Sequence, residues 1–245
     1  WDGMADDWVG MGERAWAADE ITWGEWGVPE AELRALPDDL DGLDVIELGC
    51  GTGYLGGWLA MRGARVTGVD ISERQLATAR RLAGEHGVAL SLIHASAESV
   101  PLADDSFDLA ISEYGAAIWC DPDAWLPEAA RLLRPGGRLV FLGNHPLTMA
   151  ATTPDGSVVG RELVRPWFGS GRYDWRSVEM DPGGIEFAPT IADWVRRFRA
   201  LGFSIEAYHE LRAPEGDRDE LRFAVARGWA RDYPFEHLWV VELAG

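Results

Sequence analysis

The 245-residue sequence contains no lysine, because all 22 of its basic residues are arginine. It therefore offers no lysine to form a Schiff base, to bind phosphate in a P-loop or to act as a general base. Positive charge is scarce overall, since 41 Asp and Glu residues leave a formal net charge of −19. Binding to a phosphate backbone depends on Lys and Arg that displace counterions, so DNA and RNA are poor candidate partners.

Cysteines and long apolar runs are scarce as well. The two cysteines, Cys50 and Cys120, cannot form a disulfide framework and show no metal-ligand spacing, so we expect no metal site. No apolar run reaches the length of about eighteen residues that a transmembrane helix needs. The first residues, WDGMADDW, are acidic rather than signal-like. We expect a cytoplasmic protein that acts without a membrane, as a monomer or a homodimer.

Apolar runs of strand length alternate with helical patterns from residue 43 onward. Such alternation predicts βαβ units, and hence an α/β, Rossmann-like, doubly wound and mostly parallel seven-stranded sheet with helices on both faces. Ligands should bind beyond the carboxyl ends of its strands. The expected strands are 44–48, 64–70, 89–94, 107–112, 138–144, 203–211 and 237–244.

We expect a single domain, residues 1–245, with two segments outside this rhythm. Residues 1–36 carry several tryptophans in short, helical pieces ahead of the core at 43–143. Residues 145–189 form an insert, in which GRYDWRSVEM and GIEFAP predict a hairpin across DPGG. Residues 190–245 add a helix and the last strands. The segments 1–36 and 145–189 are predicted to cover the carboxyl ends of the strands.

The stretch VIELGCGTGYLGG, residues 45–57, can be interpreted in two registers. Gly51-x-Gly53-x-x-Gly56 matches a dinucleotide fingerprint, which is typical of an NAD(P)-dependent oxidoreductase. That register puts Glu47 where the strand before the fingerprint should be apolar. The register Gly49-x-Gly51-x-Gly53 instead makes DVIEL the strand, with Glu47 near its carboxyl end. A carboxylate there suits a cationic ligand group better than a pyrophosphate.

Four motifs in this order resemble the class I S-adenosylmethionine-dependent methyltransferases. They are VIELGCGTG, Asp70 at the end of the second strand, SAESVPLADDSFDLAIS and LLRPGGRLVFLG. The resemblance covers residues 43–143 strongly and residues 190–243 more weakly. It implies that the chain binds S-adenosylmethionine and releases S-adenosylhomocysteine.

The resemblance also implies a role for each matching residue in the cofactor site. The methionine portion would meet Glu47 and the backbone of Gly49, Cys50 and Gly51. Asp70 would accept hydrogen bonds from both ribose hydroxyls, and Ile71 would pack on the adenine face. Ala97 and Glu98 would meet the adenine edge, although Ser96 stands where family members often have an acidic residue.

Methyl transfer from a sulfonium is an in-line displacement, so the protein mainly aligns the reactants and excludes water. A hydroxyl acceptor also needs a general base, for which Glu113 and His145 are candidates because each follows a strand. Glu113 is in addition a candidate for the cofactor pocket. No Asn/Asp-Pro-Pro-aromatic stretch follows the fourth strand, which argues against enzymes that methylate amino groups of nucleic-acid bases or glutamine and, with the acidic charge, favours a small-molecule acceptor. Aromatic residues in segments expected to cover the cleft suit an aromatic or apolar acceptor. The candidate acceptor-binding residues are Trp23, Tyr114, Trp119, His145 and Trp167. An oxidoreductase and a non-catalytic cofactor-binding protein remain as alternatives.

Overall fold

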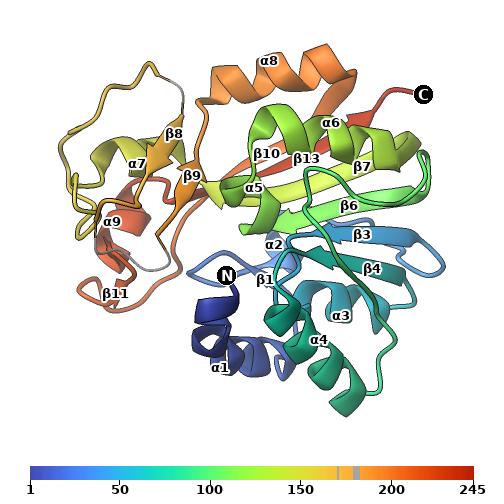
Figure 1. Ribbon diagram of the computed structural model, residues 1–245. Coiled ribbons are helices and arrows are strands. Elements are labelled where there is room, and N and C mark those ends of the chain that lie inside the picture. Colours follow the sequence, from blue (N-terminus) through green and yellow to red (C-terminus); the bar gives the residue numbers. More distant parts are fainter. Residues whose placement is uncertain (170, 179–182) are drawn as a thin grey trace.

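The computed structural model describes residues 1–169, 171–178 and 183–245. Its centre is a seven-stranded sheet made of β3 (Asp44–Leu48), β4 (Arg65–Asp70), β5 (Ser91–His94), β6 (Phe107–Glu113), β7 (Leu133–Asn144), β10 (Phe203–Leu211) and β13 (Glu236–Leu243). The order is β10-β13-β7-β6-β3-β4-β5 (Figure 1). β13 runs antiparallel to β7 and β10, and the other neighbouring pairs are parallel. The predicted α/β, mostly parallel sheet is therefore confirmed.

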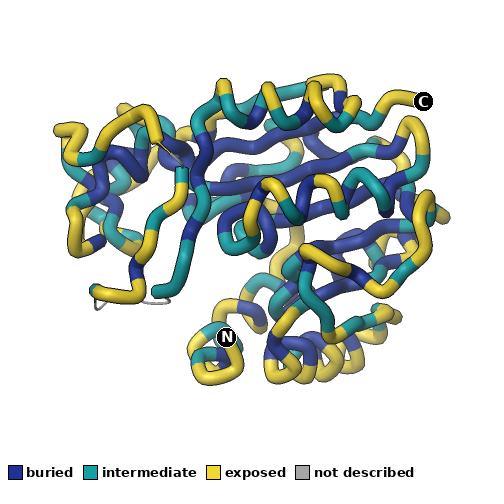
Figure 2. Tube along the Cα trace, turned by 45° about the horizontal axis from the view of Figure 1, so that its top comes forward, coloured by how far each residue is buried: buried dark blue, intermediate teal, exposed yellow. Residues whose placement is uncertain are grey.

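Helices cover both faces of this sheet (Figure 1). One face carries α1 (Ala5–Trp16), α3 (Tyr54–Ala60) and α4 (Glu73–Glu85), and the other carries α5 (Gly115–Trp119), α6 (Pro122–Leu132) and α8 (Ile191–Leu201). Trp125 of α6 and Phe198 of α8 pack on the second face with Phe141 of β7. Leu55 and Trp58 of α3 pack on the first. Figure 2 shows the buried residues following the strands between these helix layers.

Local sequence explains where the helices begin and end. α4 starts after Ser72, whose Oγ accepts a hydrogen bond from the backbone nitrogen of Gln75 at 3.2 Å. α8 starts after Thr190 and ends at Gly202, whose φ of +83° closes the last turn. α6 ends at Leu132, and β7 begins at Leu133 and contains Pro135-Gly136-Gly137. Proline disfavours helical geometry in the residue before it, here Arg134, so the helix could not have continued through this stretch.

Two segments of the chain contain elements that are not strands of the central sheet. The N-terminal one contains η1 (Asp2–Met4), α1, the paired strands β1 (Thr22–Trp23) and β2 (Val28–Pro29), and α2 (Glu30–Leu33). The second contains α7 (Pro146–Ala151) and the antiparallel strands β8 (Arg172–Asp174) and β9 (Ile185–Phe187). Pairing of β8 with β9 agrees with the expected hairpin, although residues 181 and 182 of DPGG fall outside the described residues.

Short elements complete the C-terminal region. β11 (Leu221–Arg222), β12 (Val225–Ala226) and α9 (Arg227–Asp232) lie between β10 and β13 in the chain. Valine, alanine and aromatic side chains of this region pack against the insert and Trp26. Among the described residues, the structure contains no helix with the length and apolar character that crossing a membrane requires.

Candidate functional site

A turn of alternating glycines joins β3 to α3. Gly49 and Gly51 have φ angles of +75° and +52°, in the left-handed region that favours glycine. A Cβ atom on Gly49 would lie 2.6 Å from the backbone nitrogen of Ala116, whereas one on Gly51 would have no atom within 4 Å. Gly49 thus lets α5 approach the turn, and Gly51 leaves one side open to a ligand. The Cys50 side chain is buried against Gly68, so Cys50 can offer a ligand only its backbone.

Asp70 stands at the end of β4, beside this turn. Its Oδ2 accepts a hydrogen bond from the backbone nitrogen of Gly51, and its Oδ1 accepts one from that of Ser72, both at 2.8 Å. Burial raises the pKa of the carboxyl above its usual value. Each oxygen keeps a lone pair for a further donor, such as a ribose hydroxyl. Ile71, next in the chain, has 57% of its surface exposed and offers an apolar face beside the carboxylate.

The segment that follows β5 runs alongside Asp70. The backbone nitrogen of Ala95 donates to the Asp70 carbonyl at 3.1 Å, and Ala97 is buried two residues later. The Glu98 carboxylate accepts the backbone N–H of Asp121 at 2.8 Å. Burial raises the pKa of the Cys120 thiol to about 12, and the charges of Glu98 and Asp70 add to this effect. Glu98 thus binds the residue that follows Cys120, a neighbourhood that the position of Cys120 in the sequence does not indicate.

Glu47 and Glu113 lie on the same face of adjacent strands β3 and β6. Residues two apart in a strand share a face, and Val45 and Ile111 belong to one apolar cluster. Glu47 Oε2 accepts the backbone N–H of Gly56 at 2.9 Å. Burial raises the pKa of Glu47 to about 8. The Glu47 carboxylate thus lies under the start of α3, in line with the Gly49 register.

Only one of the two carboxylate oxygens of Glu113 has a hydrogen-bond partner among the described residues. Its Oε1 accepts the backbone N–H of Gly24 at 2.7 Å, whereas its Oε2 is buried and has no hydrogen-bond partner among the described residues. Burial raises the pKa of Glu113 to about 7. A buried carboxylate with a free oxygen and a pKa near neutrality can take up a proton from a bound molecule.

Tyr114 and Glu236 extend this site toward β13. The Tyr114 hydroxyl donates to the Glu236 carboxylate, which also accepts the backbone N–H of Glu25 at 2.8 Å. Burial raises the pKa of Glu236 well above its usual value, and it raises that of Glu25 to about 6. Neither Glu25 nor Glu236 is among the residues that the sequence predicts for the site. The alternation of Glu236 with Leu238 and Val240 is the signal that could have placed Glu236 on the face of Glu113.

The structure separates His145 from this group of carboxylates. His145 precedes α7, and its Nδ1 accepts the backbone N–H of Leu147 at 3.1 Å. Its Nε2 lies 3.3 Å from the Glu210 carboxylate, and its ring packs against His237. His237 is adjacent to Glu236 in β13 and so points to the opposite face of the sheet. Burial lowers the pKa of His145, and its role as a base stays a prediction.

The predicted aromatic residues lie in different surroundings. Trp23 is fully buried, and its Nε1 donates to the Glu30 carboxylate at 2.6 Å, so it belongs to the core. Trp119 is half-buried and packs edge-to-face on Trp1 with ring centroids 5.0 Å apart. Trp167 is 37% exposed and lines a small cavity with Pro146. Trp119 and Trp167 therefore offer aromatic surface to a ligand, and Trp23 does not.

The insert and the N-terminal segment both contact the carboxyl ends of the strands. Asn144, the last residue of β7, donates to the Glu186 carboxylate of β9 at 2.5 Å. Trp175 Nε1 donates to the same carboxylate at 2.8 Å. The loop between β1 and β2 is held by Glu113 and Glu236. The candidate site therefore lies between two segments that are far apart in the sequence.

The chain is similar to known methyltransferases in sequence. The profile of a family described as a methyltransferase domain matches residues 46–141. A ubiquinone biosynthesis O-methyltransferase of Cereibacter sphaeroides is 31% identical over 185 residues, covering 68% of this chain and 73% of the relative. One from Parvibaculum lavamentivorans is 31% identical over 191 residues, covering 71% and 73%. A third, from Dinoroseobacter shibae, is 33% identical over 142 residues, and the match spans 55% of its length.

Solved structures show the same architecture. An S-adenosylmethionine-dependent methyltransferase from Mesorhizobium loti has a TM-score of 0.68 and 28% identity, covering 86% of this chain and 96% of that one. A putative S-adenosylmethionine-dependent methyltransferase from Listeria monocytogenes has a TM-score of 0.69 and 20% identity, covering 88% and 98%. The second likeness concerns the fold alone.

Proposed function

The chain belongs to the class I S-adenosylmethionine-dependent methyltransferases, and we propose on that premise that it methylates a hydroxyl oxygen of a small aromatic or apolar molecule. The family makes it an enzyme with S-adenosylmethionine as cofactor and a small-molecule acceptor. The choice of oxygen is supported by the names of the relatives, which are O-methyltransferases. The half-buried Trp119 and the exposed Trp167 offer aromatic surface that supports an aromatic or apolar acceptor.

The two alternatives are not favoured. A nicotinamide fingerprint from Gly51 would need an apolar residue at position 47, but the buried Glu47 carboxylate occupies it and bonds to Gly56. A Cβ atom on Gly56 would lie 2.6 Å from Glu47 Oε2, so this glycine serves the packing of Glu47 against α3. The relatives are named as enzymes, which disfavours a non-catalytic protein that only binds the cofactor.

The residues present fit the cofactor. The open side of Gly51 and the remaining lone pairs of Asp70 suit the homocysteine portion and the ribose hydroxyls. The exposed Ile71 and the neighbouring segment at Ala97 and Glu98 suit adenine. When bound, the cofactor supplies a methyl group on a positively charged sulfur. Removal of that positive charge drives transfer, so what remains for the protein is alignment, desolvation and proton removal.

We assign proton removal to Glu113, and its buried, unpartnered Oε2 is the observation that carries this assignment. This oxygen lies at the carboxyl end of a central strand, where ligands bind in doubly wound sheets. The raised pKa, about 7, lets Glu113 hold the acceptor's proton near neutral pH. Glu236 and Tyr114 beside it give the acceptor further polar contacts.

The test is transfer of an isotope-labelled methyl group from S-adenosylmethionine to a panel of phenols, alcohols, amines and thiols, with the product atom assigned by mass spectrometry and NMR. The proposal expects label on oxygen. Label on nitrogen or sulfur alone would refute the acceptor class while leaving the family assignment intact. The charge of −19 and the two free thiols support a cytoplasmic enzyme without nucleic-acid partners.

A further inference from the structure

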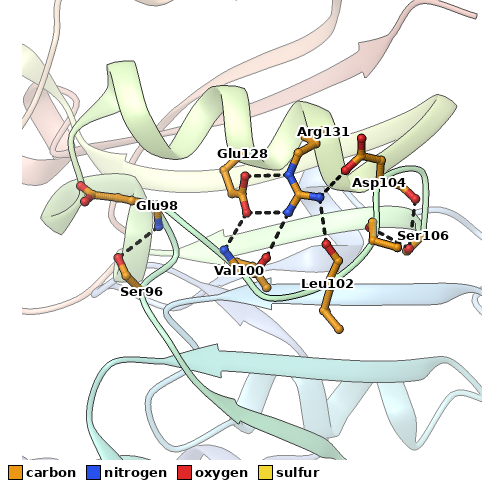
Figure 3. A network of polar contacts seen from close by, with 9 residues as sticks. Ser96, Glu98, Val100, Leu102, Asp104, Ser106, Glu128 and Arg131 are labelled. Atoms are coloured by element: carbon orange, nitrogen blue, oxygen red, sulfur yellow. Dashed lines mark hydrogen bonds and ion pairs between the residues drawn. The ribbon is translucent and has the colours of Figure 1, made fainter.

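The connection from β5 to β6 is an irregular segment rather than a helix. Residues 95–106, all described, form turns and bends that cross toward α6. Figure 3 shows side chains of α6 pointing down onto this segment, with Arg131 reaching the backbone of its second half. The first half contains Ala97 and Glu98, which the proposed cofactor site places at the adenine edge. A segment without regular hydrogen bonds needs other contacts to hold one conformation.

Arg131 supplies these contacts through its whole guanidinium. Nη1 donates to the Leu102 carbonyl at 2.9 Å and to Asp104 Oδ1 at 2.5 Å. Nη2 donates to the Val100 carbonyl at 3.1 Å. Glu128, one turn earlier in α6, accepts from Nε at 2.9 Å and from Nη2 at 2.7 Å. The planar guanidinium therefore connects Val100, Leu102 and Asp104 of the segment to α6.

Glu128 and Arg131 together hold Val100, and we call this pair the clamp. Glu128 Oε1 accepts the Val100 backbone N–H at 2.6 Å, so the N–H and the carbonyl of this residue are both fixed by the Glu128–Arg131 pair. Arg131 lowers the pKa of the Glu128 carboxyl, which keeps it charged and able to accept. Arg131 has 31% of its side chain exposed, and exposed ion pairs contribute little to stability. The main effect of the clamp is therefore to fix the position of residues 95–106 relative to α6.

The clamp leaves a short span between two fixed points. The backbone of Ala95 is bound to the Asp70 carbonyl, and the backbone of Val100 is bound to Glu128 and Arg131. Between them, Glu98 is held by the backbone N–H of Asp121. The conformation of Ala97 and Glu98 therefore depends on where Val100 is held.

We propose that Arg131 is a positioning residue for adenine recognition: through Val100 and Leu102 it fixes the segment at Ala97 and Glu98 that meets the adenine edge. The proposal assigns Arg131 no direct contact with the cofactor or the acceptor. The proposal rests on the cofactor placement under the proposed function, but it does not depend on which acceptor is methylated.

The experiment compares the affinities of the parent and of Arg131→Gln for S-adenosylhomocysteine and S-inosylhomocysteine by isothermal titration calorimetry. The two ligands differ at the adenine edge, so their affinity ratio reports adenine recognition and not cofactor binding in general. Arg134→Gln is the matched control. Arg134 also makes two ion pairs, to Asp44 and Asp108, but at the opposite, amino-terminal ends of the strands.

We expect Arg131→Gln to weaken S-adenosylhomocysteine binding about tenfold and S-inosylhomocysteine binding far less, as for residues coupled in one hydrogen-bond network. The affinity ratio then falls toward one, while Arg134→Gln keeps the parental ratio. Arg131→Lys keeps the charge without the fork and should give the same loss. It replaces Arg131→Gln if the latter does not fold.

Three outcomes would overturn the proposal. They are unchanged binding of S-adenosylhomocysteine in Arg131→Gln, an equal loss for both ligands, and a parent protein that does not distinguish them. A parent that binds neither ligand would instead refute the cofactor placement. Methylation of nitrogen rather than oxygen, measured separately, would refute the acceptor class and leave this result standing.

Discussion

Glu113 and Glu236 accept hydrogen bonds from consecutive backbone N–H groups, those of Gly24 and Glu25, at 2.7 and 2.8 Å. One loop of the N-terminal segment is thus fastened to two buried carboxylates from separate strands, β6 and β13. Burial raises the pKa of both carboxyls. Glu113, with a pKa of about 7, therefore changes charge near neutral pH while it also holds this loop.

Glu113→Gln should lower kcat by about a hundredfold, at the lower end of the effect of losing a general base. The amide keeps the shape and can still accept from Gly24, so the dissociation constant of S-adenosylhomocysteine should change little. Steady-state kinetics and calorimetry measure the two quantities. Glu242→Gln, which removes a partly exposed carboxylate paired with Arg138, is the control and should keep kcat. A parental kcat in Glu113→Gln would remove Glu113 from the chemistry.

The stability of the ligand-free protein should fall as pH rises from about 5 to about 8. Burial holds the pKa values of Glu25, Glu113 and Glu47 in the folded state at about 6, 7 and 8, against about 4.3 in the unfolded chain. In this window the folded state binds more protons than the unfolded state, so the free energy of unfolding decreases with pH, by about 1.4 kcal/mol per unit for each additional proton.

Urea denaturation at several pH values measures this slope. Glu113→Gln and Glu47→Gln should each make it shallower, because each removes one titrating group. A free energy of unfolding that increases with pH throughout the window would contradict the prediction.

Asp70→Ala should weaken binding of S-adenosylhomocysteine by roughly 1.5–3 kcal/mol, the contribution of hydrogen bonds to a charged acceptor. Asp70→Asn should lie between the parent and the alanine variant. Ser72→Ala is the matched control, because it removes the cap of α4 and costs about 1 kcal/mol of stability without touching the ligand. Calorimetry and thermal unfolding separate the two effects. If Asp70→Ala melts lower but binds normally, Asp70 only supports the turn.

Trp119→Ala and Trp23→Ala should differ in what they damage. Trp119 is half-buried beside Trp1, so its removal should raise the KM for the acceptor with a small effect on stability. Trp23 is fully buried, and its removal should cost about 3–5 kcal/mol of unfolding free energy. Chemical denaturation and acceptor kinetics of both variants provide the comparison. Unchanged acceptor KM in Trp119→Ala would exclude it from the binding surface.

The sequence predicts the sheet well because its signals are local. Apolar runs such as DVIEL and RLVFLGN become β3 and the second half of β7, and Asp70 ends β4 as expected. The glycine turn is local too, and its left-handed φ angles agree with the choice of Gly49 as the first glycine. Short local patterns in the sequence are therefore enough to predict the sheet and the part of the proposed cofactor site at the glycine turn and Asp70.

Contacts between distant segments were beyond these local patterns. Glu25 and Glu236 are 211 residues apart, and no periodicity links them. His145 follows a strand as Glu113 does, but the position of a loop residue relative to the two faces depends on the path of α7. Trp23 lies in the short strand β1 and is fully buried, whereas Trp119 ends α5 and is half-buried, and neither difference can be inferred from the residue type. Burial and side-chain direction decide these cases.

The interior position of β13 has a consequence for biosynthesis. β13 lies between β7 and β10, and it brings Glu236 to the loop at Gly24 and Glu25. Before Glu236 is translated, β7 and β10 lack the strand that lies between them. The loop at Gly24 and Glu25 is then bound by Glu113 but not yet by Glu236. The region around β3, β4 and β6 can order earlier, because its strand pairs are already translated. The contact between Glu236 and this loop therefore forms only after β13 is translated, when the strand pairs around β3, β4 and β6 can already be ordered.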